Sequence, residues 1–134
     1  MRDGVVKHPE LPPALNELTE HVIGAAIEVH RALGPGLLEA CYEEALCAEL
    51  TLQQIPFTRQ PQVELFYKNR SVGTGRLDLL VDDQLVVELK CVEALAGVHT
   101  AQVLSYLRAS GHRLGLLINF NVPVLKDGIK RIVL

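Results

Sequence analysis

Hydrophobic residues recur at two different spacings along the chain, and the spacings predict a helical first half followed by a strand-rich middle. Over residues 15–33 the apolar positions keep helical spacing, and Gly34-Pro35-Gly36 ends that helix because proline cannot continue it. A second helix is expected over residues 37–52. Its buried stripe would consist of Leu38, Cys41, Ala45, Ala48 and Leu52. The two helices are therefore predicted to form an angled hairpin around a stiff joint.

Alternating apolar and polar residues replace the helical spacing in the middle of the chain and predict strands. A first strand is expected around residues 63–67, followed by a tight turn at Asn69-Arg70 and a second strand over residues 72–81. A third strand covers residues 85–90. The middle of the chain is thus predicted to form three consecutive antiparallel strands.

Helical spacing returns over residues 100–109. The continuous apolar run within residues 113–120 is typical of a strand that is covered on both faces and lies in parallel register after a helical crossover. A last short strand over residues 129–134 is expected at a sheet edge. The order predicts an α/β (α+β) fold with a mixed central sheet flanked by helices. We expect the chain to form one domain over residues 14–134, after a flexible N-terminal arm over residues 1–13.

Composition agrees with a single domain that has an aliphatic core. The chain has 134 residues, is 49% hydrophobic and contains no tryptophan, as expected where helices cover a sheet. Cys41, Cys47 and Cys91 lack any C-x-x-C spacing, and no N-terminal apolar stretch resembles a secretion signal. We therefore expect a cytoplasmic protein without a membrane segment, whose cysteines are small buried hydrophobes. The net charge of -3 argues against a general nucleic-acid coat protein, although local phosphate contacts depend on where Lys and Arg lie.

Asp78, Glu88 and Lys90 lie on the two strands that flank a polar turn and are the main candidates for chemistry. Asp78 faces Glu88 only if the turn holds an odd number of residues, most simply residues 82–84. A turn of two residues would pair Asp78 with Leu89 instead. A site built from this trio therefore depends on the length of the turn.

Two interpretations of the trio stay open. One face of an antiparallel sheet is ordinarily solvated, so the three charged side chains could simply lie on a solvent-exposed face. If helices cover both faces of the central strands, the gathered carboxylates need a cation or a raised pKa. A divalent ion such as Mg²⁺ takes oxygen ligands, and Lys90 beside it could orient or help deprotonate an attacking water and offset charge on a phosphate.

The trio also resembles a known motif. Asp78, nine further residues and then Glu88-Leu89-Lys90 are similar to the core of the PD-(D/E)XK nuclease superfamily. The proline that precedes the first aspartate in that motif is absent, because Leu77 stands there. The four-cysteine cluster of some RecB-type relatives is missing too, so this chain alone would not bind an iron-sulfur cluster.

Two further patterns strengthen the resemblance. Gly36, Glu39 and Tyr42 form G-x-x-E-x-x-Y, the pattern of the GxxExxY family, which itself resembles PD-(D/E)XK nucleases. Gln102 and Tyr106 are similar to the Q-x-x-x-Y helix motif of RecB-type members. The resemblance runs from about residue 19 to residue 134.

The resemblance implies a restriction-endonuclease-like αβββαβ core and hydrolysis of a phosphodiester by metal-activated water. The ligands of the metal, Mg²⁺ or Mn²⁺, would be Glu39, Asp78, Glu88 and the Leu89 carbonyl. Catalysis would be carried by Asp78, Glu88 and Lys90. Substrate binding or support of the site would come from Tyr42, Arg76, Gln102 and Tyr106.

Each supporting residue has a structural alternative. Glu39 lies in the first turn of a helix, where a carboxylate can cap backbone amides instead of binding a metal. Tyr42 could hydrogen-bond near the site or simply pack. Gln102 and Tyr106 share a helix face and could reach a phosphate, hold the Lys90 amine or pack on the sheet. Four basic residues are either phosphate contacts or ordinary surface charges: Arg59, Lys68, Arg76 and Arg108.

The sequence therefore favours a Mg²⁺- or Mn²⁺-dependent nuclease, with DNA as the expected substrate. Because the chain carries no added DNA-reading module, target recognition would need a homodimer or a partner protein. The alternative is a non-catalytic binding or regulatory module on the same scaffold, since a fold alone does not confer chemistry. Convergence of the carboxylates of Glu39, Asp78 and Glu88 would favour the nuclease.

Overall fold

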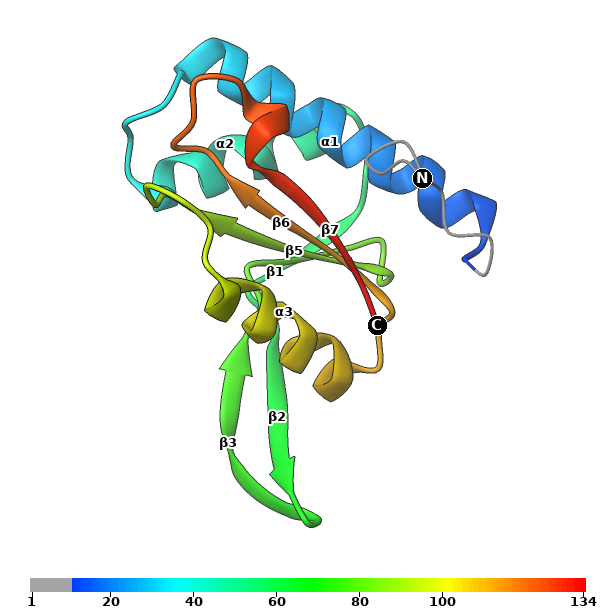
Figure 1. Cartoon of the computed structure of the whole chain (residues 1–134). Helices are drawn as coiled ribbons and strands as arrows, with labels where there is room; N and C mark the ends of the chain where they lie inside the picture. The colour runs from blue at the N-terminus through cyan, green and yellow to red at the C-terminus, as the bar shows by residue number, and fades with distance from the viewer. Residues whose placement is uncertain (1–10) are drawn as a thin grey trace, which may run out of the picture.

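The computed structural model describes residues 11–134 as a five-stranded mixed sheet with helices on both faces and a separate two-stranded hairpin (Figure 1). The helices are α1 (Pro13–Leu33), α2 (Glu39–Leu52), α3 (Gly97–Ser110) and the short 3-10 helix η1 (Leu125–Gly128). The strands of the sheet, in spatial order, are β1 (Phe57–Arg59), β4 (Leu79–Val81), β5 (Leu85–Lys90), β6 (Leu114–Asn119) and β7 (Ile129–Val133). The hairpin consists of β2 (Gln62–Tyr67) and β3 (Arg70–Arg76). The predicted α/β (α+β) class with a mixed central sheet flanked by helices is confirmed.

The sheet has a hydrophobic layer on each face. Because successive strand residues point to opposite faces, β5 contributes to both layers. Val87 and Leu89 join the cluster formed with α1 and α2, whereas Val86 packs with Val103 and Leu107 of α3. The central strands are therefore covered on both sides, and a charge on β5 does not lie on an open sheet face.

The strand pairing near the candidate site follows the predicted register. Val81 pairs with Leu85, so the turn between β4 and β5 holds the three residues 82–84. Strand β5 pairs with β6 in parallel, with α3 as the crossover, and β7 lies at the sheet edge. All three expectations are confirmed.

The predicted continuous strand over residues 72–81 is wrong, because the structure divides it at Leu77 and Asp78. The Leu77 amide donates to the Pro61 carbonyl at 3.0 Å, and the Asp78 carbonyl accepts from the Gln60 amide at 2.9 Å. These bonds to the β1–β2 connection replace sheet bonds. The predicted pairs β2–β3 and β4–β5 are present, but they belong to different sheets.

The division has two further consequences for the predicted elements. In a continuous strand Leu77 and Leu79, two residues apart, would lie on one face, but Leu77 joins Val86 in the cluster beneath α3 while Leu79 packs on the opposite face. Strand β1 was not predicted. It pairs with β4, whereas the strand around residues 63–67 had been expected as the neighbour of the whole strand over residues 72–81. The edge strand is too short to show an alternating pattern in the sequence.

The predicted buried stripe of α2 is also wrong. Leu38, Cys41 and Leu52 are exposed. The buried residues are instead Tyr42, Glu43, Leu46, Cys47 and Leu50. The helix is rotated because the Tyr42 ring stacks on Phe120, with centroids 4.5 Å apart, while Glu43 turns toward a partner on β1. Of the three cysteines expected to be buried, Cys47 is buried and Cys91 is half-buried.

The predicted flexible arm over residues 1–13 lies mostly outside the described residues. Within them, Leu11 is buried in the core and α1 begins at Pro13. Proline suits the first helical position because its missing amide hydrogen has no partner there in any helix. None of the helices within residues 11–134 has the length and apolar character needed to cross a membrane.

Candidate functional site

The side chains of Asp78 and Glu88 each accept a hydrogen bond from a backbone amide of the other's chain segment, where β4 begins and β5 ends. The Asp78 amide donates to Glu88 Oε2 at 2.9 Å, and the Leu89 amide donates to Asp78 Oδ2 at 2.7 Å. Each carboxylate thus accepts a backbone bond where the strand is interrupted. The Oδ1 atom of Asp78 and the Oε1 atom of Glu88 are not used in these two bonds, so they are available as ligands.

The interruption also changes the surroundings of the Leu89 carbonyl. Leu79 faces Val87, so continuing the register would place Leu77 opposite Leu89, where the two would exchange backbone bonds. The Leu77 amide donates to the β1–β2 connection instead. The N–H and C=O groups of a strand residue point to the same side, so the Leu89 carbonyl points toward Asp78 without its ladder donor.

Burial gives the two carboxyl groups unusual proton affinities. Glu88 is only 3% exposed, and burial, followed by the nearby Asp78 charge, raises its pKa to about 8. Burial likewise raises the pKa of Asp78, against the lowering effect of the Leu89 amide. The Lys90 charge lowers the pKa of both groups. An added cation would favour the ionised form of the pair in the same way.

Glu39 lies in the first turn of α2 within electrostatic reach of this pair. Its pKa is raised by desolvation first and by the Asp78 charge second, while Lys90 lowers it. The N-terminus of α2 has no side-chain cap hydrogen bond, so Glu39 does not fill the capping role left open by the sequence. The Glu39 charge is therefore coupled to those of Asp78 and Lys90.

The donor set suits a hard divalent cation through two carboxylates and a carbonyl. Oxygen ligands of this kind are the ones that Mg²⁺ and Mn²⁺ prefer. No three acidic, histidine or cysteine side chains in the part of the chain that the structure describes are gathered closely enough to hold a metal ion. Asp78 and Glu88 are brought together, and Glu39 does not complete a three-carboxylate cluster with them.

Lys90 is held by the helix that follows it in the chain. Its Nζ donates to Gln102 Oε1 at 3.3 Å, and Gln102 Nε2 donates to Tyr106 Oη at 3.4 Å. The Tyr106 ring in turn lies against Gly75 of β3. Of the roles left open for the Q-x-x-x-Y pair, the structure shows two: Gln102 holds the Lys90 amine, and Tyr106 also packs on the cluster beneath α3.

Gly75→Ala is expected to disturb this chain of contacts. A Cβ atom at Gly75 would lie 2.6 Å from Tyr106 Cε1, so the ring must move and loosen Gln102. We expect the free energy of unfolding, measured by urea denaturation, to fall by about 1–3 kcal/mol. Gly24→Ala is the control, because nothing lies within 4 Å of that added methyl group and alanine favours a helix. Equal stability of Gly75→Ala and the wild type would contradict the packing argument.

Tyr42 lies in the core and not beside the carboxylates. Its hydroxyl donates to the Gly34 carbonyl and accepts from the Leu37 amide at 3.2 Å, and the side chain is fully buried against Phe120. The tyrosine thereby fixes the joint between α1 and α2. It supports the position of Glu39 through the backbone and does not touch the site itself.

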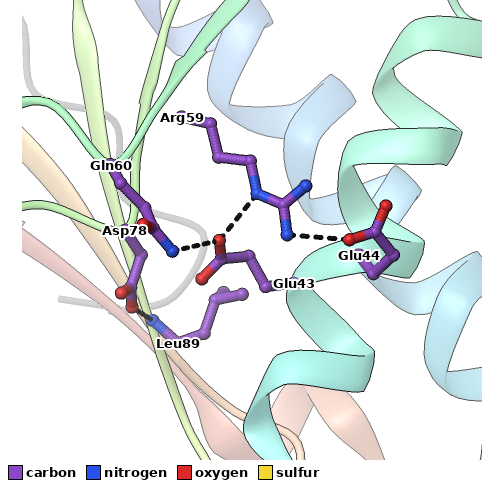
Figure 2. A network of polar contacts seen from close by, with 6 residues as sticks. All are labelled: Glu43, Glu44, Arg59, Gln60, Asp78 and Leu89. Atoms are coloured by element: carbon purple, nitrogen blue, oxygen red, sulfur yellow. Dashed lines mark hydrogen bonds and ion pairs between the residues drawn. The ribbon is translucent and has the colours of Figure 1, made fainter.

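Glu43 is a site neighbour that the sequence analysis missed. It is buried, and its Oε2 accepts from Arg59 Nε at 2.8 Å and from Gln60 Nε2 at 2.9 Å. Its charge raises the pKa of Asp78. Figure 2 shows Arg59 joining Glu43 to Glu44, with Asp78 nearby on the sheet. The signal in the sequence is the spacing of four residues from Glu39, which places both carboxylates on one helix face.

Two of the basic residues have different surroundings. Arg59 is engaged by two carboxylates, and its hydrogen bonds with Glu44 and Glu43 raise its pKa. Arg76 is exposed at the end of β3, and its charge lowers the pKa of Asp78. Arg59 is thus occupied by carboxylates of α2, whereas the charge of Arg76 acts on Asp78 of the site.

Comparison with known proteins gives one family match. The model of the PD-(D/E)XK nuclease superfamily matches residues 16–132, a range that contains all the site residues described above. A search of curated proteins finds no match. The narrower GxxExxY assignment is not confirmed by these comparisons.

Proposed function

We propose a function on one premise: this chain belongs to the PD-(D/E)XK nuclease superfamily. The proposed activity is hydrolysis of phosphodiester bonds in nucleic acid, with DNA as the substrate and Mg²⁺ or Mn²⁺ as the cofactor. One observation supports it above the others. The half-buried Asp78 and the buried Glu88 lie side by side, each accepts a backbone amide with one oxygen, and Lys90 is close enough for its charge to lower the pKa of both.

The unused oxygens of Asp78 and Glu88 and the Leu89 carbonyl would hold the cation, with Glu39 at the rim. When bound, the cation would polarise the phosphate and lower the pKa of an attacking water. Lys90, aimed by Gln102, stabilises the negative charge that develops on the phosphate. Tyr106 keeps Gln102 in place, and Arg76 attracts the phosphate beside Asp78.

The setting of the activity is part of the proposal. We place the protein in the cytoplasm, where the free thiols of Cys41, Cys47 and Cys91 stay reduced. We propose that target recognition comes from a homodimer or a partner protein.

A second candidate function is a binding module that has kept the scaffold and lost cleavage. The observation that favours it is the lack of a ready three-ligand cluster within residues 11–134. Such a module would bind nucleic acid in the same place. The two candidates therefore differ in turnover and not in the ligand.

The test is a cleavage assay on single-stranded DNA, duplex DNA and RNA with Mg²⁺ or Mn²⁺, and with EDTA in parallel. We expect metal-dependent cleavage that falls by about 10²–10³-fold in Asp78→Asn and in Lys90→Met, because each removes a charge that acts in the transition state. Asp83→Asn is the matched control, since that carboxylate is exposed in the turn. Cleavage that survives both substitutions, or that EDTA leaves unchanged, would refute the nuclease and favour the module.

A further inference from the structure

The β2–β3 hairpin projects away from the body of the protein. Figure 1 shows it extending past α3, on the opposite side of the sheet from α1 and α2. Only its base is packed: Val63 and Leu65 join the cluster beneath α3. The outer half of the ribbon has no covering layer, so its side chains are available to a partner.

The outer half of the hairpin combines aromatic and basic side chains. Phe66 is 65% and Tyr67 61% exposed, and as successive strand residues they point to opposite faces of the ribbon. Lys68 and Arg70 follow, and the Lys68 Nζ atom lies 5.3 Å from the centroid of the Tyr67 ring. Each aromatic ring therefore has a cation close to it in the chain.

The charge of the hairpin differs from that of the whole protein. Residues 62–76 carry three basic side chains and one acidic side chain, whereas the chain as a whole has a net charge of -3. The acidic side chain, Glu64, accepts a hydrogen bond from Ser71. A phosphate backbone is attracted to a basic element of this kind even when the rest of the surface repels it.

The turn at the apex retains a lysine where the backbone disfavours one. Lys68 and Asn69 both have positive φ, at 48° and 65°, one residue earlier than the turn predicted at Asn69-Arg70. Such two-residue turns favour Asn-Gly, and lysine in this conformation is uncommon. A charge is thus placed at the outermost point of the ribbon at some cost to the turn.

We propose that the β2–β3 hairpin is a contact surface for single-stranded nucleic acid, in which Tyr67 and Phe66 stack on unpaired bases while Lys68 and Arg70 bind phosphates. Exposed aromatic rings interleaved with basic residues are the usual means of holding unpaired strands. The inference deepens the proposed function by naming the substrate class. It rests on that function because it assumes that the bound nucleic-acid strand runs from the hairpin to the active site.

The base of the hairpin leads directly to the candidate active site. Strand β3 ends at Arg76, two residues before Asp78, and Gly75 contacts the tyrosine that supports Gln102 and Lys90. At a rise of about 3.3 Å per residue, the six steps from Arg70 to Arg76 place the tip of the hairpin roughly 20 Å from its base beside the site. That span corresponds to about six nucleotides at roughly 3.4 Å each. A bound strand would therefore reach the hairpin only if it extends that far from the scissile phosphate.

The experiment measures binding without cleavage. Fluorescence anisotropy in EDTA follows a labelled 20-nucleotide DNA strand, the same sequence as a duplex, and a 4-nucleotide strand. The charge variant is Lys68→Asn with Arg70→Thr, because asparagine suits the turn and threonine suits the strand. The stacking variant is Tyr67→Thr. The control is Lys126→Gln, which removes an exposed charge on η1, away from the hairpin.

We expect both hairpin variants to weaken binding of the 20-nucleotide strand at least about fivefold. The charge variant should also reduce the slope of log affinity against log salt by about 1.4, the value for two contacts on a single strand. The control and the 4-nucleotide strand should show no change. Unchanged binding in the hairpin variants, equal weakening in the control, or no binding by the wild type would overturn the inference.

Two other outcomes also count against it. A larger effect on the duplex would assign the hairpin to paired DNA. A change in sedimentation coefficient with unchanged binding would assign it to contact between two copies of the chain. Because binding is measured in EDTA, it is independent of the nuclease proposal. If the hairpin variants bind more weakly but the wild type never cleaves, the activity alone is refuted. If the wild type cleaves and Asp78→Asn abolishes cleavage, but the hairpin variants bind as the wild type does, the hairpin inference alone is refuted.

Discussion

Glu88→Gln is expected to lower kcat/KM for nucleic-acid cleavage by about 10²–10³-fold while the fold is retained. The glutamine side chain has the same shape, and its carbonyl oxygen can still accept the Asp78 amide bond that Glu88 Oε2 accepts now. It cannot supply the negative charge that a divalent cation needs from a ligand. The measurement is steady-state cleavage of the substrate that the wild type cuts.

The control for this substitution is Glu93→Gln, which neutralises an exposed carboxylate shortly after the same strand. Its activity should equal that of the wild type. A Glu88→Gln protein that cleaves within tenfold of the wild-type rate would show that the buried carboxylate does not act in the reaction. The unfolding midpoint of each variant distinguishes lost chemistry from lost structure.

Without a divalent cation, the stability of the wild type is expected to decline as the pH rises from about 4.5 to about 8. The pKa of Glu88 is raised from 4.5 to about 8 on folding, mainly by burial, so in this window the folded protein keeps a proton that the unfolded chain releases. Stability falls with pH wherever the folded state binds more protons, and the loss is complete above the folded pKa. The effect is on the order of a few kcal/mol.

The pKa of Asp78 is raised by burial as well and acts in the same direction. Mn²⁺ should reverse the decline, because a cation favours the ionised carboxylates. Thermal unfolding with and without Mn²⁺ measures this: the increase in Tm should be larger near pH 9 than near pH 5.5. Glu88→Gln should remove most of the pH dependence, whereas Glu17→Gln on the exposed surface of α1 should not. An equal increase in Tm with Mn²⁺ at both pH values would contradict the assignment of Asp78 and Glu88 as ligands that bind the cation in their ionised form.

The sequence predicted the contact between Asp78 and Glu88 because that contact depends on local rules. Alternation fixes which residues share a face, and the number of residues in the turn fixes which of them meet. The structure has the three-residue turn, and the two carboxylates accept each other's strand amides. The link from Lys90 to Gln102 likewise depends on one helix face and was among the predicted roles.

The parts that were not predicted depend on partners distant in the sequence. The division of the long strand follows from the bond between the Leu77 amide and the Pro61 carbonyl, which leaves no trace in the apolar pattern. The rotation of α2 follows from the stacking of Tyr42 on Phe120. Glu43 is buried because Arg59 and Gln60 bond to its carboxylate. The spacing of apolar residues cannot predict this, because it assigns charged residues to the surface.

The carboxylates at the interrupted strand also provide two built-in spectroscopic probes. The amide protons of Asp78 and Leu89 each bond to a carboxylate oxygen, whereas ordinary ladder amides bond to carbonyls. The chemical shift of the first amide therefore senses the ionisation of Glu88, and that of the second senses the ionisation of Asp78. An NMR titration of these two resonances can follow the two acids separately, in the intact protein and without any substrate.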